Sequence, residues 1–479
     1  MVFQSTWSRV VASLIVVPAV LASTLALAQP KPGARIPERA IERAAQLRAD
    51  ALDSDLGYRV IESLTTEVGP RLAGSEADAR AVAWAQAKFK ALGYDRVWLE
   101  PVTFPKWVRR SERADVLGAH AQPLVVSALG GSPGGTVEGD VVRFADFAAL
   151  DAVADGALAG KVAFVDYAMQ RQRDGSGYGA ASRIRSRGPS LAARKGAAAF
   201  LMRSAGTDAH RNPHTGMTRF EDGQRPIPAA AMSVPDAQQL ARLLSIGPQR
   251  VRVALDCGWD GTATSHNVIG EITGRGKPHE VVLIGGHLDS WDLGTGAVDD
   301  ASGVGITMAA GALIGRLPAP PARSIRVVAF ANEEQGLHGG RAYANAHADA
   351  LTRHAIAAES DFGAGRIYAF ATSASAQAMP AEAQIAAALA PLGIAHTPGQ
   401  GGPGPDLRPF VEKGLAWAAL RQDGTDYFDL HHTPDDTFDK IDPKAIAQNV
   451  AAYAVFAYLA ASAPVGFGSA PKAPTSPTP

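Results

Sequence analysis

The sequence predicts an α/β fold: a mixed, mainly parallel sheet with helices on both faces, and an inserted domain. From His266 onward, short β-branched runs alternate with stretches of helical spacing, an order that is typical of a largely parallel sheet. Short apolar runs between Gly-rich turns fill residues 111–256 and indicate a separate α/β module. The chain has 46% hydrophobic and 19% charged residues, a composition that is typical of globular proteins.

The first residues carry a pattern of their own. Arg9 precedes an apolar run over residues 10–27, and small residues end this run at Ala28. The order is typical of a secretory signal peptide. We therefore expect residues 1–28 to be cleaved after Ala28 and the protein to be secreted or periplasmic, without a membrane anchor. An uncleaved anchor is the alternative, which Pro18 within the run disfavours.

The main domain is predicted to follow a tether and to come in two parts. Pro-rich residues 29–37 form the tether, and residues 38–110 form the first part. This part shows helical patterns over residues 38–64, broken at 53–57, and over residues 76–92, and then an extended pattern over residues 97–104.

Residues 111–256 form the predicted insertion. Its strand patterns lie at residues 124–129, 162–165, 197–201 and 229–232, and its helical patches at residues 190–195 and 236–244. His210 and His214 lie here in a polar loop without carboxylates at ligand spacing, so we expect no metal site within the insertion.

Residues 257–462 form the predicted second part of the main domain. Strands are expected at residues 281–284, 325–331, 356–359, 367–370 and 415–420, and helices at residues 303–317, 337–347, 381–392 and 443–460. Functional groups of parallel sheets gather at the carboxyl ends of the strands. Residues 463–479 are rich in Pro, Ser and Gly, which predicts a disordered tail.

The charge balance and the cysteine content limit the binding partners and the disulfide bonds that can be expected. Lys plus Arg number 46 and Asp plus Glu number 47, so the charge gives no reason to expect nucleic acid or an anionic membrane as partner. Cys257 is the sole cysteine, which excludes an intrachain disulfide. We expect it to be buried as a small apolar residue.

Polar residues cluster at successive points of the second part. The clusters are His287-Leu288-Asp289, Asp299-Asp300, Glu333-Glu334, Glu359-Ser360-Asp361 and His431-His432. Each has an ordinary explanation by itself, such as a loop histidine or acidic residues that cap a helix start. Their succession at equivalent topological positions is better explained by one common site.

The histidines and carboxylates of these clusters predict a metal centre. His287, Asp299, Glu334, Asp361 and His432 form a ligand set that suits Zn²⁺, with Mn²⁺ or Co²⁺ as alternatives. Charge counting favours two ions, because three carboxylates and one bridging hydroxide would balance two divalent cations.

Taken in order, the motifs resemble those of a known family. Gly-His-x-Asp, Asp-Asp-x-Ser-Gly, Asn-Glu-Glu-x-Gly, Glu-Ser-Asp and His-Thr-Pro-x-Asp-Thr are similar to motifs of the co-catalytic zinc exopeptidases of the aminopeptidase and glutamate carboxypeptidase type. Residues 285–292 and the loop at residues 69–75 look most like the carboxypeptidase Q branch. The resemblance covers most of residues 38–460. It implies the zinc exopeptidase, phosphorylase/hydrolase-like fold, with a protease-associated-like domain at residues 111–256.

The resemblance also implies two zinc ions per chain. Asp299 would bridge them, His287 and Asp361 would complete one site, and Glu334 and His432 the other. In this family the peptide bond after the bridging aspartate is often cis.

Roles for neighbouring residues follow from the same resemblance. Glu333 would act as the general base, and Asp289 would orient His287. His431 and Tyr427 are candidate donors to the oxyanion, and simple packing of their loop is an equally good explanation.

Candidates for substrate recognition are less specific. Asp406 and Arg408 lie in a Gly/Pro-rich loop, residues 399–409, and are candidates for a specificity pocket, although solvated loop charges are the more ordinary explanation. Arg71, Arg408 or Arg421 could hold a terminal carboxylate, and spacing selects none of them.

The implied function is a secreted exopeptidase, similar to carboxypeptidase Q, that hydrolyses dipeptides or terminal residues of short peptides. Aminopeptidase action at the same site is the main alternative. A non-catalytic binding protein on the same scaffold would be expected to lack ligands, and a glutaminyl cyclase with one zinc would not need the full carboxylate set. The expected partners are a peptide substrate and, by resemblance, a second copy of the chain in a homodimer.

Overall fold

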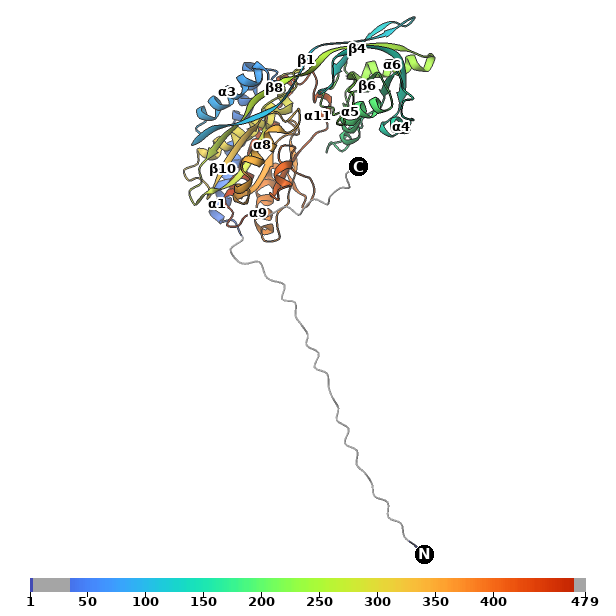
Figure 1. Cartoon of the computed structure of the whole chain (residues 1–479). Helices are drawn as coiled ribbons and strands as arrows, with labels where there is room; N and C mark the ends of the chain where they lie inside the picture. Colours follow the sequence, from blue (N-terminus) through green and yellow to red (C-terminus); the bar gives the residue numbers. More distant parts are fainter. Residues whose placement is uncertain (3–34, 469–479) are drawn as a thin grey trace. The chain divides into compact units, whose positions relative to one another are not determined.

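The computed structural model describes residues 1–2 and 35–468 (Figure 1). The expected signal peptide, residues 1–28, therefore lies outside the described residues except for its first two positions. The same holds for most of the expected tether and for residues 469–479 of the expected tail.

Three helices open the main domain, as the sequence predicts. They are α1 (Glu38–Leu52), α2 (Leu56–Glu67) and α3 (Glu76–Ala91). On α1, Ala40, Ala44, Leu47 and Ala51 are buried, which is the stripe that a helix presents to a core. Ser75 begins α3, because its side chain accepts a hydrogen bond from the N–H of Asp78.

A mixed, mainly parallel sheet forms the centre of the main domain. Its strands are β9 (Lys277–His287), β10 (Arg323–Phe330), β11 (His354–Glu359), β12 (Ile367–Thr372), β13 (Ala395–His396) and β14 (Trp417–Gln422). The central strand β9 is parallel to both neighbours, β10 and β11. β14 continues parallel to β11, whereas β12 runs antiparallel to β14. The predicted α/β class, with a mixed and mainly parallel sheet, is confirmed.

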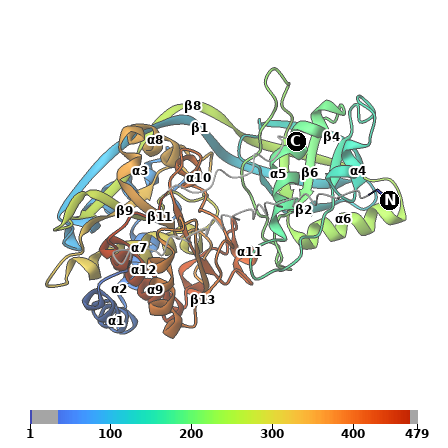
Figure 2. The same cartoon turned by 90° about the horizontal axis from the view of Figure 1, so that it is seen from below.

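Helices cover both faces of this sheet (Figure 2). They are α7 (Ser302–Gly315), α9 (Met379–Leu389) and α12 (Pro443–Ser462) on one face, and α8 (His338–Ala346) with the short α10 (Arg408–Val411) on the other. Along β9, Val282 and Ile284 pack into the first of these two cores, and Val281 and Leu283 into the second. Burial on both sides explains why the strand is apolar without alternation. It also explains why α7 and α12, which are almost wholly buried, are apolar on all sides.

A long antiparallel ribbon extends from the edge of β10. It consists of β1 (Arg96–Leu117) and β8 (Arg250–Ile272) and leads away from the main sheet (Figure 1). The sequence predicts only residues 97–104 of it, because the polar residues farther along face solvent and resemble loop. The predicted limits of the insertion fall opposite each other on this ribbon, where Ser111 pairs with Asp256.

Residues between the two ribbon strands build further sheet and helices. The strands are β2 (Gln122–Leu124), β3 (Val126–Ala128), β4 (Gly135–Phe144), β5 (Val162–Val165), β6 (Ala199–Arg203) and β7 (Ala229–Met232), and the helices are α4 (Phe147–Asp151), α5 (Tyr178–Arg194) and α6 (Val234–Ile246). β4 to β7 run parallel in order, and a hydrophobic cluster is shared with the ribbon. Cys257 is buried there, and burial raises the pKa of its thiol to about 11.

Helix α5 is much longer than the patch at residues 190–195 that the sequence indicates. Pro189 lies inside it, and a proline is ordinarily a sign that a helix has ended. Gly188 before it is needed for packing, because a Cβ there would lie 2.7 Å from the ring of Phe200.

The packed chain also extends beyond the limits expected from composition. Ile36, in the expected tether, is buried and exchanges hydrogen bonds of 2.8 and 3.1 Å with the side chain of Gln384. Phe467, in the expected tail, is fully buried, and its carbonyl accepts from the N–H of Ser375 at 2.7 Å. Ile36 and Phe467 help to fix these two segments, and a composition average does not detect such single apolar residues.

Replacement of Phe467 by alanine should destabilise the protein by about 3–5 kcal/mol, the usual cost of emptying a buried aromatic site. A lower midpoint in thermal unfolding followed by circular dichroism would show it. Gly466→Ala is the matched control, because a Cβ at Gly466 meets nothing within 4 Å. Equal midpoints for the two variants would mean that residues 463–468 do not pack as described.

Candidate metal centre

The carboxyl ends of three neighbouring parallel strands meet at one edge of the main sheet. His287 is the last residue of β9, Glu333 and Glu334 follow β10, and Asp361 follows β11. Because β10 and β11 flank β9 on either side, these side chains converge above the same strand end. His432 reaches them from the loop after the short helix α11 (Tyr427–Leu430).

Asp299 lies between two groups of these residues. Its Oδ1 is 3.1 Å from Nε2 of His287, which is itself 3.7 Å from Oδ1 of Asp361. Its Oδ2 is 3.2 Å from Nε2 of His432, which is 3.0 Å from Oε2 of Glu334. The structure therefore brings all five predicted ligands together, with one aspartate shared between two histidine–carboxylate pairs.

Both histidines face the cluster with the same ring nitrogen. Nδ1 of His287 lies 3.1 Å from the carbonyl oxygen of Asp289, and Nδ1 of His432 lies 3.1 Å from the carbonyl oxygen of Thr215. A carbonyl oxygen only accepts, so each Nδ1 carries the hydrogen and the Nε2 lone pair is directed at Asp299. This is the tautomer that a zinc ligand needs.

The cluster suits a bound cation on electrostatic grounds. Asp299 Oδ2 and Glu334 Oε1 are buried without a hydrogen-bond partner among the described residues, and a buried carboxylate is costly unless something compensates it. Burial raises the pKa of Glu334. Burial would also raise that of Asp299, but the adjacent imidazoles of His287 and His432 hold the pKa of Asp299 well below its usual range. Carboxylate and imidazole ligands of this kind fit zinc.

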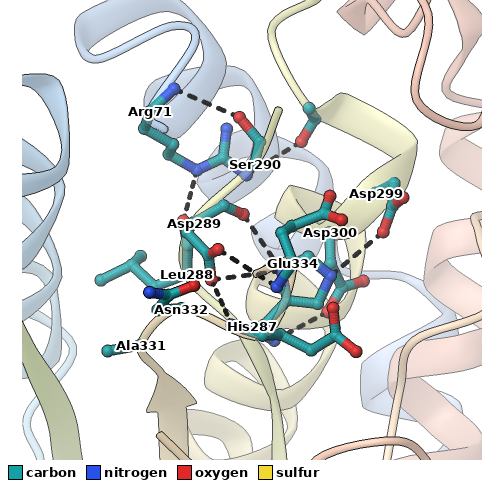
Figure 3. A network of polar contacts seen from close by, with 12 residues as sticks. Arg71, His287, Leu288, Asp289, Ser290, Asp299, Asp300, Ala331, Asn332 and Glu334 are labelled. Atoms are coloured by element: carbon teal, nitrogen blue, oxygen red, sulfur yellow. Dashed lines mark hydrogen bonds and ion pairs between the residues drawn. The ribbon is translucent and has the colours of Figure 1, made fainter. Parts of the chain in front are cut away.

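Asp289 contacts both His287 and the turn after β10, through different atoms. Its carboxylate accepts hydrogen bonds from the N–H groups of Glu333 at 3.0 Å and Glu334 at 3.4 Å. Figure 3 shows Asp289 beside Glu334. The carboxylate is 3.7 Å from Nδ1 of His287, farther than the backbone carbonyl of the same residue. Asp289 thus holds the His287 ring through its main chain, and the turn after β10 through its side chain.

Two further aspartates, Asp300 and Asp436, fix the segment that carries Asp299. Asp300 accepts from the N–H groups of His287 and Gly303, both at 3.0 Å. Asp436 accepts from the N–H groups of Val298 at 2.6 Å and Asp299 at 3.1 Å. The peptide bond between Asp299 and Asp300 is cis, as the resemblance implied. Both aspartates lie within the motifs quoted above, and this position was the sequence feature that could have indicated their role.

Arg71 is excluded as a substrate-binding residue. It is fully buried and donates to the carbonyl oxygens of Gly69 at 3.3 Å, Thr295 at 2.6 Å and Gly296 at 3.0 Å, and also to that of Leu288. Figure 3 shows it beside the segment that follows His287. Its guanidinium joins the loop at residues 69–75 to the segments that follow His287 and precede Asp299. It does not face the space in which a substrate would bind.

A cavity of about 820 Å³ opens onto the cluster. It is lined by residues of the cluster and its neighbours, namely Asp299, Glu333, Glu334, Asp361, Tyr427, His431 and His432. Two arginines, Arg408 and Arg421, also line it. Asp406 is fully buried beneath, where it accepts from the N–H of Gly340 at 3.1 Å. The other wall comes from residues 174–219, which carry no motif; these lining residues are Asp174, Tyr178, Ser182, Arg185, Ser186, Arg187, Met217 and Arg219.

His431 and Tyr427 both border this cavity. The ring of His431 stacks on that of His432 with centroids 3.5 Å apart and an interplanar angle of 21°. Burial and the neighbouring His432 lower the pKa of His431 well below its usual range, and burial raises the pKa of Tyr427 well above its own. Both side chains are therefore neutral, and each can donate a hydrogen bond to a group in the cavity.

Comparison with known proteins gives one consistent result. The model of peptidase family M28 matches residues 267–457. Carboxypeptidase Q of Bos taurus is 33% identical over 406 residues, which cover 84% of this chain and 85% of the bovine protein. The solved peptidase M28 precursor from Shewanella amazonensis is 48% identical with a TM-score of 0.88, covering 91% of this chain and 99% of that one. A zinc aminopeptidase from Bacillus subtilis shares the fold, with 19% identity and a TM-score of 0.60 over 84% of this chain and 94% of that one. The chain therefore belongs to peptidase family M28 and is a metallo-exopeptidase, a hydrolase that acts on peptides.

Proposed function

We propose that this chain is a secreted zinc exopeptidase that hydrolyses dipeptides or terminal residues of short peptides, in the manner of carboxypeptidase Q. The observation that carries the proposal is the geometry around Asp299, where two histidines present Nε2 to the two oxygens of one carboxylate. Similarity to carboxypeptidase Q over most of both chains supports the substrate class.

Two zinc ions are proposed. Asp299 would bridge them, with His287 and Asp361 holding one and Glu334 and His432 the other. The grouping of distances supports this division, and so do the buried carboxylate oxygens that no described hydrogen-bond donor satisfies. When bound, the zinc ions supply Lewis acidity that polarises a peptide carbonyl and makes a water molecule more acidic.

Glu333 is proposed as the general base. It borders the cavity but stands outside the cluster of ligands, and its N–H is anchored on Asp289. Burial raises its pKa well above the usual range, and the nearby charges of Asp361 and Glu334 add to the shift. A carboxylate of raised pKa accepts a proton from water and returns it to the leaving amine. Tyr427 and His431 are the proposed donors to the oxyanion.

We also propose that residues 111–256 are an inserted domain of protease-associated type, with residues 38–110 and 257–462 as the two parts of the peptidase domain. The antiparallel pairing of Ser111 with Asp256 supports a common entry and exit for this segment. Aminopeptidase action remains the second candidate, because Glu333 and Glu359 also border the cavity and a carboxylate can hold a substrate ammonium group.

Glu333→Ala and Glu333→Gln should each lower kcat by on the order of 10²–10⁴-fold, since the proton acceptor is lost. Dipeptide hydrolysis measured on protein of known zinc content would test this. Glu412→Gln, which changes an exposed glutamate, is the control and should retain full activity. Near-normal turnover by both Glu333 variants with zinc still bound would contradict the mechanism.

The zinc-reconstituted protein should contain two zinc ions per chain by elemental analysis. Asp361→Ala should retain about one, because it removes a ligand from one group only. Asp299→Ala should retain fewer than one, because it removes the shared carboxylate. A wild-type protein that takes up a single ion at saturation would contradict the two-ion centre, and Glu412→Gln again serves as the control.

The secreted product should begin at Gln29. Expression of the full chain in a secreting host, followed by N-terminal sequencing of the exported protein, would identify the cleavage point. Recovery of the intact chain in the membrane fraction would favour the uncleaved anchor instead.

A further inference from the structure

One face of helix α5 is turned toward the cavity of the candidate centre. Tyr178, Ser182, Arg185 and Ser186 line the cavity, and their spacing of four, three and one residues places them on one side of a helix. This helix belongs to the segment between the two ribbon strands, outside the motifs that recur in the sequence. The wall opposite the strand ends is therefore built by residues for which the proposed function has so far assigned no role.

Arg185 is the residue of this face that reaches the centre itself. Its Nη1 lies 3.5 Å from Nδ1 of His432, donates to the hydroxyl of Tyr178 at 2.5 Å and approaches the carbonyl of Thr215 at 3.5 Å. The guanidinium carbon lies 5.5 Å from the centroid of the Tyr178 ring. These contacts fix the orientation of the guanidinium and place it next to His432, a proposed zinc ligand.

The positive charge of Arg185 is not balanced locally. Over residues 35–468 it forms no ion pair with a carboxylate, and its Nε is buried without a hydrogen-bond partner. A half-buried guanidinium in such a position is costly unless an anion joins it. By contrast, Arg421 across the cavity lies 3.9 Å from Asp174 and 5.3 Å from the ring of Tyr368, and Arg408 is exposed.

We infer that Arg185 binds a carboxylate of the substrate, and that this group is the terminal α-carboxylate of the residue on the leaving side of the scissile bond. The inference rests on the proposed function. Nη1 contacts Tyr178 and Thr215 and Nε is buried, which leaves Nη2 to donate to a carboxylate oxygen in the cavity. In a dipeptide the α-carboxylate is about one residue, roughly 3.8 Å, from the scissile carbonyl, which matches a cation located beside His432. Arg185 is thus a specificity-determining residue for carboxypeptidase polarity.

The test compares one dipeptide in three forms: with a free terminal carboxylate, with that carboxylate amidated, and as an amide whose last side chain is glutamate. Activity is measured for zinc-loaded wild type, Arg185→Gln and Arg185→Lys. Arg183→Gln is the matched control, because Arg183 is on the same helix but packs over the ring of Phe147 at 4.4 Å, away from the cavity. Thermal unfolding and zinc content are recorded for every variant.

For the free carboxylate, Arg185→Gln should lower kcat/KM by on the order of 10- to 100-fold, the effect of losing a charge-assisted hydrogen-bonded pair. The loss should appear mainly in KM. The amidated dipeptide should be a poor substrate for every protein, and Arg185→Gln should change its rate little, so the preference for the free acid collapses. Arg185→Lys should restore part of that preference, because it keeps the charge without the planar fork.

Three results would overturn the inference. An equal loss on the free and amidated forms, together with loss of zinc, would mean that Arg185 only supports Thr215 and His432. Dependence on Arg185 for the glutamate side chain, but not for the terminal carboxylate, would assign the site to an acidic side chain. A preference for the free acid that Arg185→Gln leaves intact would place the carboxylate elsewhere. These outcomes all require an active wild type, so a zinc-loaded wild type that cleaves no form would instead contradict the proposed function itself.

Discussion

Asp299 shares its two carboxylate oxygens between two histidine rings, and both rings face it through Nε2. The arrangement is possible because each ring donates its Nδ1 hydrogen to a backbone carbonyl, that of Asp289 or that of Thr215. Buried carboxylates that accumulate at one sheet edge lose hydration and repel each other. Bound cations would offset this cost, and a rigid main chain keeps the side chains in place.

The rigid main chain comes from a set of buried side-chain to backbone hydrogen bonds. Asp289 holds the turn after β10, Asp300 joins the end of β9 to the start of α7, and Asp436 holds the segment before the shared aspartate. Gly303 is required where these loops meet, because a Cβ there would lie 1.9 Å from the carbonyl oxygen of Ser360. Arg71 completes the set with four backbone carbonyls. Asp289, Asp300 and Asp436 therefore face the main chain, whereas Asp299, Glu334 and Asp361 face the two histidines.

Sequence patterns predicted the central sheet, its covering helices and the five residues of the cluster, because these depend on local signals. Apolar runs define buried strands, and the polar residues stand directly at their ends. Two kinds of feature escaped prediction. Most of the ribbon of β1 and β8 was not predicted, because its polar residues face solvent. Most of α5 was not predicted either, because it contains a proline. The α5 wall of the cavity depends on long-range packing, which leaves no motif in one sequence. The burial of Arg71 also had no local signal, since an arginine in a Gly-rich loop is ordinarily exposed.

The segment between the ribbon strands is a structural component of the centre. The carbonyl of Thr215 is the acceptor that fixes the tautomer of His432, and the N–H of Thr215 donates back to the carbonyl of His432 at 3.1 Å. Arg109 on the ribbon donates to the hydroxyl of Thr215 at 3.3 Å, so the contact is tied to the base of the segment. Without these residues the ring of His432 would lose its orienting partner and the cavity would lose its cationic wall. The proposed ligand geometry and the inferred substrate recognition are therefore linked through the same few residues, a coupling that the motifs alone do not contain.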